Sequence, residues 1–515
     1  MNDALFLTIL LPVLAAVFVL LVPSRAASAV RGVSFTAQLL ALLFALAAYI
    51  GFNKGMAVFQ FPFAATWLTV SNAFGTTPLV IRFAFGADGI SMPLILLTGV
   101  VGLMASMRSH SIHERVKEHY FWQLLLTAGL YGVFASADLF TFFFFLEATL
   151  VATYFLISVW GNEGRRRVAT KFLIYRGLAS VVLLAGFIGL AYSYAVQAQG
   201  ASMQVYLGFA PNFLSLSIPQ LISEAGKFQL SLAAQNVLYL VFLLAVLVEE
   251  AFVPFHTWLP DTHEQADTGT NMLIGGVLMK IGLYIMLRFA VELLPQGLQH
   301  FAWLTGLLGV ISILYGALVA LAQKDWRRLI AFSSISHMGL VLLAIASLQA
   351  AGLQGAVFML VSSGLLTALL FYAVGAQADR TKTFEIKNLG GLSKSLPVIS
   401  GVLLVAVLGS VGLPGMSGFI SEFALFLGSF AIFPWLAAVA TLGMILVALY
   451  LLYAMQRTTF GPQRTEYDQL ADARPVEYVA MAVFVALVIL IGVYPSVLGD
   501  VVHTTVQSIA GRIGG

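Results

Sequence analysis

The stretch VEEAFVPFHTWLPD, residues 248–261, decides the fold. It ends a long apolar run, and it places the adjacent carboxylates Glu249 and Glu250 a few residues before Pro254. Proline has no backbone N–H, so it opens a helix at this point. An apolar helix that is interrupted beside carboxylates is typical of ion transporters, whose sites lie near the middle of the membrane.

A second interrupted stretch supports this interpretation. GSVGLPGMSGFISEF, residues 409–423, carries Pro414, Gly415 and Gly418 in an otherwise apolar run. The two stretches occupy corresponding places in two blocks of five predicted helices, 120–295 and 296–456. An odd number of helices inverts one block relative to the other, so the sequence predicts two inverted repeats, each with a broken helix. The flanking parts are 1–119, with three predicted helices, and 457–515, with the last helix and a tail.

The composition predicts a polytopic all-α membrane protein. Of the 515 residues, 60% are apolar and only 10% are charged, against about 25% charged in ordinary soluble domains. Runs of about 17–25 apolar residues mark spanning helices. Fourteen are predicted, at 4–23, 29–51, 88–106, 120–136, 138–160, 172–196, 232–256, 268–290, 301–322, 328–348, 354–376, 397–430, 432–455 and 477–499. The connections 52–87 and 197–231 are interpreted as surface loops.

The placement of Lys and Arg predicts the orientation. If the N-terminus lies outside, 19 of the 26 basic residues fall on the cytoplasmic side, as the positive-inside rule requires. Lys54, Arg82, Lys227, Arg288 and Arg512 fall outside. The sequence therefore predicts a multi-pass protein of the bacterial inner membrane with both termini on the periplasmic side, and it shows no cleaved signal or transit peptide. A thylakoid location stays open.

The sequence lacks the residues that several classes of protein function require. The chain has no cysteine, which excludes disulfides, thiolate metal sites and cysteine-ligated Fe–S clusters. It also lacks a dinucleotide fingerprint, a phosphate loop, a nucleophile elbow and a haem ligand set. We expect no cofactor and no metal in this chain, and no redox chemistry from it alone.

A few ionisable residues remain inside the predicted spans. They are Glu147, Arg176, Glu249, Glu250, Lys280, His337 and Glu422. A charge at the centre of a spanning helix costs roughly 2.5–3.5 kcal/mol, and such residues mark proton or ion paths. Glu147, in FFFFLEATL at 142–150, is expected to be buried and to carry protons.

Plainer interpretations stand beside these. Glu147 could be a structural partner of Lys171 or Arg176, Lys280 could extend to a membrane surface, and His337 could be a packing histidine. Arg176 is interpreted as a counter-ion. His256 and His263 are expected to cap the end of the helix, and His110, His113 and His119 to be solvated.

Three stretches resemble a known family. They are ADLFTFFFFLEATLVATYFLISVWG at 137–161, VPFHTWLPDTH at 253–263 with GGVLMKIGLYIMLRF at 275–289, and LAQKDWRRLIAFSSISHMGLVLL at 321–343. Together they are similar to the antiporter-like subunits of respiratory complex I, and most closely to the M-type (chain 4) subunits. The pattern covers most of residues 85–460.

The resemblance implies a row of proton-carrying groups along the membrane plane. By motif, Glu147 takes the role of the helix-5 glutamate, Lys280 that of the helix-8 lysine, and His337 that of the first relay histidine. Glu422 takes the role of the carboxylate on the exit side. The resemblance also implies L-like and N-like membrane subunits and lipid as partners, no nucleic acid, and NAD(P)H, FMN, Fe–S clusters and quinone bound by other subunits.

The sequence departs from the family at two relay positions. Glu249 stands where the family has lysine on the broken helix 7, and Ser363 stands where it has a second relay histidine. Asp267 replaces a proline. Glu147 and Glu249 could not both ionise without a cation and would share a proton, so Arg176 is a candidate replacement cation.

Three functions are therefore open. The chain could be a proton-translocating subunit of an NAD(P)H:quinone oxidoreductase of the complex I type. It could instead belong to a multi-subunit Na⁺/H⁺ antiporter, or be a structural complex I subunit that moves no protons.

Overall fold

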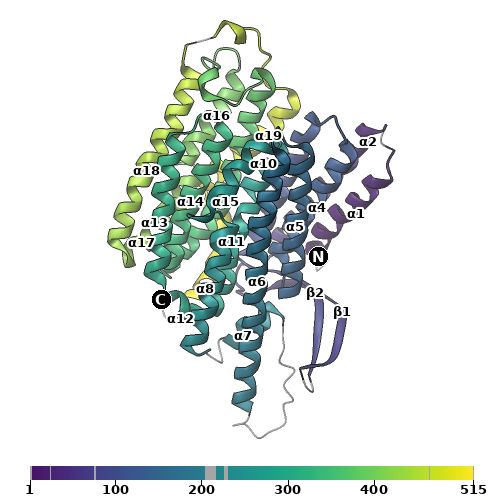
Figure 1. The fold of residues 1–515 in the computed structure, drawn as a ribbon, viewed down its shortest axis with the longest axis vertical. Helices are drawn as coiled ribbons and strands as arrows, with labels where there is room; N and C mark the ends of the chain where they lie inside the picture. The colour runs from purple at the N-terminus through teal and green to yellow at the C-terminus, as the bar shows by residue number, and fades with distance from the viewer. Residues whose placement is uncertain are drawn as a thin grey trace.

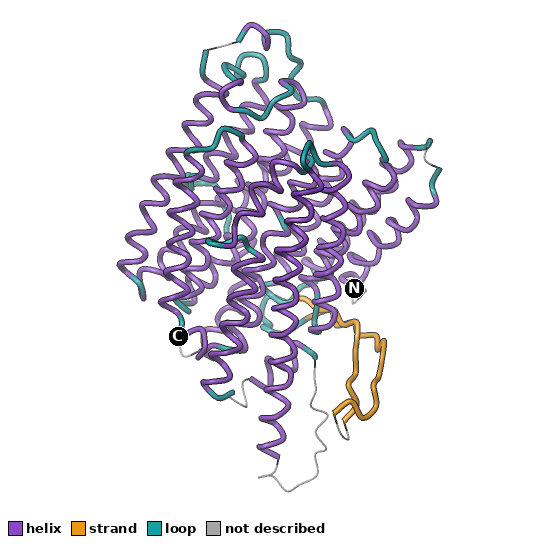
Figure 2. Tube along the Cα trace, in the orientation of Figure 1, coloured by secondary structure: helices purple, strands orange, loops and turns teal. Residues whose placement is uncertain are grey.

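The protein is a bundle of long helices. The structure is a computed structural model that describes residues 3–23, 25–74, 77–202, 216–225, 230–462 and 464–513. Most helices run side by side through the body of the molecule, and a β-hairpin extends from one end (Figures 1 and 2). The predicted helical membrane-protein class is confirmed, with this hairpin as its exception.

The first half of the chain supplies the following helices, in order: α1 (Ala4–Leu21), α2 (Ala27–Ile50), α3 (Ser91–Arg108), α4 (Val116–Ala135), α5 (Leu139–Trp160), α6 (Arg165–Ser202), α7 (Ile218–Ala225), α8 (Leu232–Glu249), α9 (Trp258–Gln265), α10 (Thr268–Gly276) and α11 (Ile281–Ile285).

The second half supplies these helices: α12 (Pro295–His300), α13 (Ala302–Leu321), α14 (Trp326–Ala346), α15 (Ala350–Thr381), α16 (Pro397–Ser410), α17 (Ser417–Ile432), α18 (Pro434–Met455), α19 (Pro475–Val493) and α20 (Ser496–Ile513). α20 was not predicted; the sequence analysis left these residues as a tail.

The apolar helices match the predicted spans closely. Among the described residues, 12 helical segments are long and apolar enough to cross a membrane. α4, which begins with charged residues, and the shorter apolar pair α16 and α17 fall outside that set but lie at two further predicted positions. The total of fourteen spans and the inverted relation of the two repeats stay predictions.

Two connections are not plain loops. Residues 52–87 contain an antiparallel hairpin of β1 (Gln60–Phe74) and β2 (Thr77–Ala87), so the interpretation of this segment as a loop was wrong. Aromatic side chains such as Phe63, Phe83 and Phe85 favour strands. Phe63 stacks on Phe85 and on Phe6 of α1, and Phe83 packs against Phe140 of α5. Of the second connection, 203–215 and 226–229 lie outside the described residues, and α7 lies between them.

Both predicted helix breaks are present. α8 ends at Glu249, and the chain passes Ala251, which has a left-handed φ of 55°, before a short 3-10 turn leads into α9. α16 and α17 are separated by residues 411–416, where Gly412 and Gly415 have φ values of 81° and 90°. A left-handed φ ends a helix and is readily adopted by glycine.

A third irregularity was not predicted. The sequence analysis expects one continuous helix over 268–290, but the structure has α10, a 3-10 turn at Leu278–Lys280, α11 and a π-helix at Met286–Val291. Short 3-10 and π segments inside helices are frequent at functional sites. This segment, α14 and α15 are buried along their whole apolar windows and form the centre of the bundle.

The two predicted groups of basic residues lie at opposite ends of the helices. At one end Arg31 Nη2 donates to the Ile112 carbonyl at 2.8 Å, and Arg108 pairs with Asp379 at 2.9 Å. At the other end Lys54 contacts Asp500 of α20 at 3.4 Å. Lys227 lies outside the described residues. Which end faces the cytoplasm stays a prediction.

Candidate functional site

A buried ion pair stands at the first helix break. Arg176 of α6 points at the last residue of α8, and its Nη2 lies 2.5 Å from Oε2 of Glu249. Its Nη1 also donates to the Glu249 backbone carbonyl at 3.2 Å. Both side chains are about 1% exposed. Removing one member of such a pair leaves an uncompensated buried charge, at a cost of about 3–5 kcal/mol.

Lys280 and Glu250 lie next to this pair. Lys280 ends the 3-10 turn and is fully buried, so it does not extend to a membrane surface. Its Nζ contacts the Met338 sulfur of α14 at 3.8 Å. Glu250 is also fully buried, and its Oε2 accepts the Gly282 N–H at 3.1 Å. Glu250 lies inside the predicted span, and the motifs of the sequence give it no role.

Glu147 differs from its expectation. It is only partly buried, because its face of α5 lies at the surface of the chain, with Phe144 46% exposed and Val151 41% exposed. Nor does it pair with Lys171 or Arg176, since Lys171 binds Asp261 and Arg176 binds Glu249. Glu147 lies on α5, which packs against α6, and α6 in turn packs against α8, where Glu249 ends the helix.

A second buried pair stands at the other break. His337 of α14 lies with Nε2 3.8 Å from Oε1 of Glu422 on α17. Its Nδ1 lies 2.8 Å from the Ser333 carbonyl and its Nε2 lies 3.0 Å from the Ser410 carbonyl. Carbonyls only accept, so both bonds form together only when both ring nitrogens carry hydrogen. A neutral imidazole can donate to one of these carbonyls at a time, and a proton gained by His337 would complete both bonds beside Glu422.

Ser363 lies against this pair. A cavity of about 20 Å³ is lined by Ser363, His337 and Glu422, among others, and a volume of that size holds about one water molecule. Ser363 Oγ and Glu422 Oε1 are buried with no hydrogen-bond partner among the described residues. The resemblance leads one to expect a histidine at position 363. The shorter serine leaves a small polar cavity there instead.

Two further groups support His337 and were missed. Ser333 Oγ lies 3.5 Å from His337 Nδ1 and accepts a 2.8 Å hydrogen bond from the hydroxyl of Tyr450 on α18. The Ser333–His337 spacing of four residues places both on one helix face and was readable from the sequence. The sequence does not indicate the contact of Tyr450 with Ser333, because only the packing of α13, α14 and α18 brings the two residues together.

Three further histidines, His119, His256 and His263, are buried, whereas His110 and His113 are exposed as expected. His119 is fully buried, and its Nε2 lies 3.5 Å from Oδ2 of Asp267, so the expectation of a solvated histidine was wrong. Burial raises the pKa of Asp267, but hydrogen bonds from His119 and Thr270 outweigh this and hold it below its usual value. His263 bonds Asn271 at 2.8 Å inside the bundle. Asp267 caps α10 through the Thr270 N–H.

A second charged cluster lies at the hairpin end. Arg288 binds both oxygens of Asp88, at 2.7 and 2.8 Å, and Oε1 of Glu292 at 2.7 Å. Arg288 is counted among the basic residues on the outer side in the prediction of orientation, but it is 1% exposed within the π-helix. Arg512 of α20 reaches Glu292 at 3.4 Å. This cluster joins α20 to the centre of the bundle.

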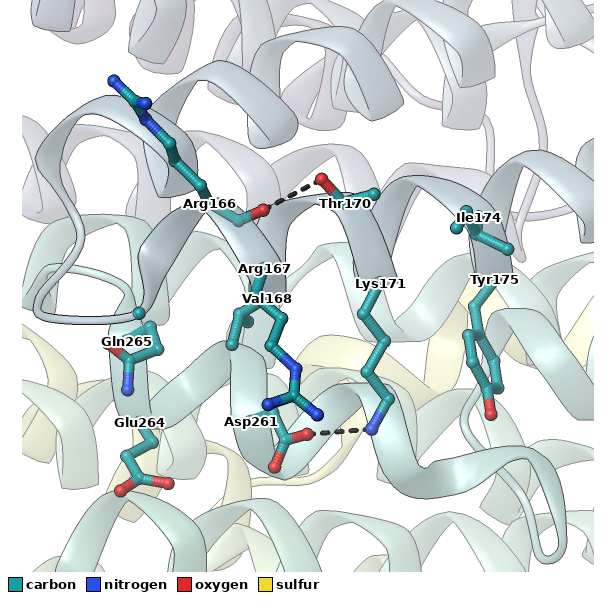
Figure 3. A pocket seen from close by; sticks show the side chains of 11 residues that line it. Arg166, Arg167, Val168, Thr170, Lys171, Ile174, Tyr175, Asp261, Glu264 and Gln265 are labelled. Atoms are coloured by element: carbon teal, nitrogen blue, oxygen red, sulfur yellow. Dashed lines mark hydrogen bonds and ion pairs between the residues drawn. The ribbon is translucent and has the colours of Figure 1, made fainter.

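An open surface pocket of about 830 Å³ lies between α6 and α9. Figure 3 shows Lys171 reaching Asp261 across it, at 2.8 Å. Arg328 of α14 also binds Asp261, at 3.0 Å, and Glu264, at 2.7 Å. Although burial raises the pKa of Asp261, these two cations hold it below its ordinary value. The pocket lies at the surface. Its ion pairs hold α9, the second half of the broken helix, against α6 and α14.

The described residues include no group of three His, Asp or Glu side chains that could hold a metal ion. The site presents several titratable side chains. Two buried acid–base clusters stand at two broken helices, and Lys280 lies buried in the centre of the bundle. This arrangement is typical of one class of protein, the transport subunits that move protons or small cations through a membrane.

Comparison with known proteins gives the family. Residues 136–449 match the family described as NADH:quinone oxidoreductase/Mrp antiporter, TM. The chain is 36% identical over 515 residues to NAD(P)H-quinone oxidoreductase chain 4 1 of Synechococcus elongatus, with 98% of this chain and 91% of that protein covered. This chain belongs to the NADH:quinone oxidoreductase/Mrp antiporter transmembrane family.

Solved structures agree with this assignment. A chain of respiratory complex I from Thermus thermophilus with bound NADH superimposes with a TM-score of 0.85 and 28% identity, covering 99% of this chain and 100% of that chain. A chain of the Mrp complex from a Dietzia strain superimposes with a TM-score of 0.79 at 20% identity, covering 100% and 99%, which shows the shared fold.

Proposed function

We propose that the chain is the M-type (chain 4) proton-translocating subunit of an NAD(P)H:quinone oxidoreductase of the complex I type. One observation carries this proposal. Ionisable groups are buried at both helix breaks, at Arg176–Glu249 and at His337–Glu422, and the buried Lys280 lies in the segment packed between α8 and α14. Buried groups that can exchange protons along a line of contacts are what proton transfer requires.

In this proposal protons enter near Glu147, pass Glu249 and Lys280, and leave through His337 and Glu422. Arg176 is the cation that allows Glu249 to ionise in a dry interior, in the role that the lysine of the family has on helix 7. Because arginine does not lose its proton, the proton-carrying member of this pair is the glutamate.

The redox chemistry belongs to partner subunits. NAD(P)H, FMN, Fe–S clusters and quinone are proposed to bind there, and L-like and N-like subunits are the proposed neighbours in the membrane. The half-exposed Glu147 supports a protein neighbour on the α5 face, since a carboxylate against lipid tails is unfavourable. We place the protein in the bacterial inner membrane with both termini on the periplasmic side.

The test is proton uptake per electron pair in sealed vesicles that contain the assembled complex. Wild type is compared with Glu147→Gln while electron transfer and subunit content are followed. Uptake should fall in the variant with assembly preserved. Unchanged uptake and turnover would remove Glu147 from the path and favour a structural subunit.

Antiport is the second candidate, supported by the likeness to the Mrp chain. A Na⁺/H⁺ antiporter subunit needs no electron donor. Vesicles without NAD(P)H or quinone would then acidify or alkalinise in response to a Na⁺ gradient, and the complex I proposal expects no such response.

A further inference from the structure

Glu250 is a buried carboxylate that the mechanism above leaves without a role. It follows α8 directly, at the point where the helix breaks, and none of its surface is exposed. Its two oxygens differ: Oε2 accepts the Gly282 N–H, and Oε1 has no hydrogen-bond partner among the described residues. An ionised carboxylate in a dry interior needs several donors, so a single N–H leaves it poorly satisfied.

The position of this carboxylate is set by close packing. A Cβ atom on Gly282 would lie 2.7 Å from Glu250 Oε2 and 3.0 Å from the Glu250 Cβ. Only glycine allows the start of α11 to approach the end of α8 this closely. The carboxylate therefore lies directly against the turn that follows Lys280.

The charged groups around Glu250 are of two kinds. Its electrostatic neighbours are Lys280 of the 3-10 turn, Arg176 of α6 and the adjacent Glu249. Arg176 and Glu249 already bind each other. Lys280 has no carboxylate within ion-pair distance among the described residues, and its flexible four-carbon stem can move its ammonium group toward Glu250.

We propose that Glu250 exchanges a proton with Lys280 and is itself a proton-carrying residue of this chain. The proton leaves Nζ of Lys280, which becomes a neutral amine, and binds Oε1 of Glu250, which becomes a carboxylic acid; the reverse step restores both charges. Oε2, as the carbonyl oxygen of the acid, keeps its hydrogen bond from Gly282. No other reactant is needed.

The exchange is physically reasonable because the medium is dry. Separated buried charges lose their hydration, so a neutral acid and amine compete well with an ion pair there. Arg176 stays charged, because arginine does not lose its proton, and it sets the local field. The inference rests on the proposed proton-translocating function and adds a residue to it.

The experiment uses the assembled complex in sealed vesicles and four variants. Glu250→Gln should lose proton uptake per electron pair, whereas Glu250→Asp, which keeps a titratable group, should retain part of it. Glu292→Gln is the matched control: it removes a buried carboxylate that is paired with Arg288 outside the relay, and uptake should persist. Glu147→Gln tests the parent proposal in the same assay.

The outcomes separate the two proposals. Loss of uptake in Glu147→Gln with normal uptake in Glu250→Gln would overturn the role of Glu250 and leave the function standing. Normal uptake in both would overturn both. If the complex with Glu250→Gln fails to assemble, infrared difference spectra of wild type and Glu250→Asp test whether residue 250 exchanges a proton. A carboxylic-acid C=O band that shifts in Glu250→Asp supports the exchange, and its absence refutes it.

Discussion

Arg176 Nη2 and Glu249 Oε2 lie 2.5 Å apart, with a second contact from the guanidinium to the Glu249 backbone carbonyl. The resemblance to complex I subunits leads one to expect a lysine at the position of Glu249. The structure shows that a cation is still present at the break of the helix but comes from α6. Arginine does not lose its proton, whereas a lysine can, so in this pair only Glu249 can change its charge.

Replacing Arg176 by Gln should destabilise the protein by about 3–5 kcal/mol, because it leaves Glu249 as an unpaired buried charge. The thermal unfolding midpoint of the purified complex measures this. Arg176→Lys keeps the charge but not the bidentate geometry, so its loss should be smaller.

The double variant Arg176→Gln, Glu249→Gln checks the cause. With both charges gone, no unpaired ion remains, and the midpoint should recover toward wild type. A double variant as unstable as the sum of the two single variants would show that the residues contribute independently, contrary to the ion-pair interpretation.

Gly412→Ala should lower both stability and proton uptake. Gly412 has a left-handed φ of 81°, and a Cβ there would overlap Oε2 of Glu422. The backbone strain costs roughly 1–2 kcal/mol, and the carboxylate must also move away from His337.

Gly415→Ala is the matched control for that variant. Its φ is 90°, but a Cβ there meets nothing within 4 Å. It should share the loss of stability and keep normal proton uptake. Equal uptake in the two variants would show that the position of Glu422 does not matter.

Ser363→Ala should change stability by less than about 1 kcal/mol, because it removes a buried hydroxyl that has no partner. Ser363→His, which restores the family residue, overfills a cavity of about 20 Å³ and should cost about 1–3 kcal/mol. Unfolding midpoints measure both. Loss of proton uptake in a stable Ser363→Ala complex would instead place the hydroxyl on the path.

Acid should weaken the α6–α9 contact through Asp261. The pKa of Asp261 in the folded protein lies below its ordinary value of 3.8. Its stabilising effect is therefore present above that value and is lost as the pH falls through the lower, folded pKa. As the pH falls through this range, the free energy of unfolding of the wild type should decrease. In Asp261→Asn this decrease should be absent.

The size of this effect is limited, because surface ion pairs contribute about 0–1 kcal/mol. The exposed Lys54–Asp500 pair provides a control variant, Asp500→Asn, which should leave the acid dependence unchanged. An identical acid response in wild type and Asp261→Asn would contradict the assignment.

Much of the fold was predictable, because the signals are local. Apolar runs of spanning length and the helix-breaking Pro254 and Gly415 act through their own backbone, so the bundle and both breaks were predicted from the sequence. The hairpin at 60–87, the helix α20 and the irregular segment 268–291 were not, since their conformations depend on contacts with distant segments. Burial of Arg176, Glu249, Lys280 and Glu422 was predicted from their places in apolar runs, but the buried Asp88–Arg288–Glu292 cluster was not.

The sequence by itself determined the membrane class, the positions of the helix breaks and most of the ionisable residues that are buried around those breaks. Only the tertiary structure decided which of them meet: Arg176 with Glu249 rather than with Glu147, His337 with Glu422, and Glu147 at the surface. The reason is that side-chain pairing depends on how α5, α6, α8, α14 and α17 rotate and pack. The rotation of each helix depends on its contacts with all its neighbours, so it cannot be predicted from any single stretch of sequence.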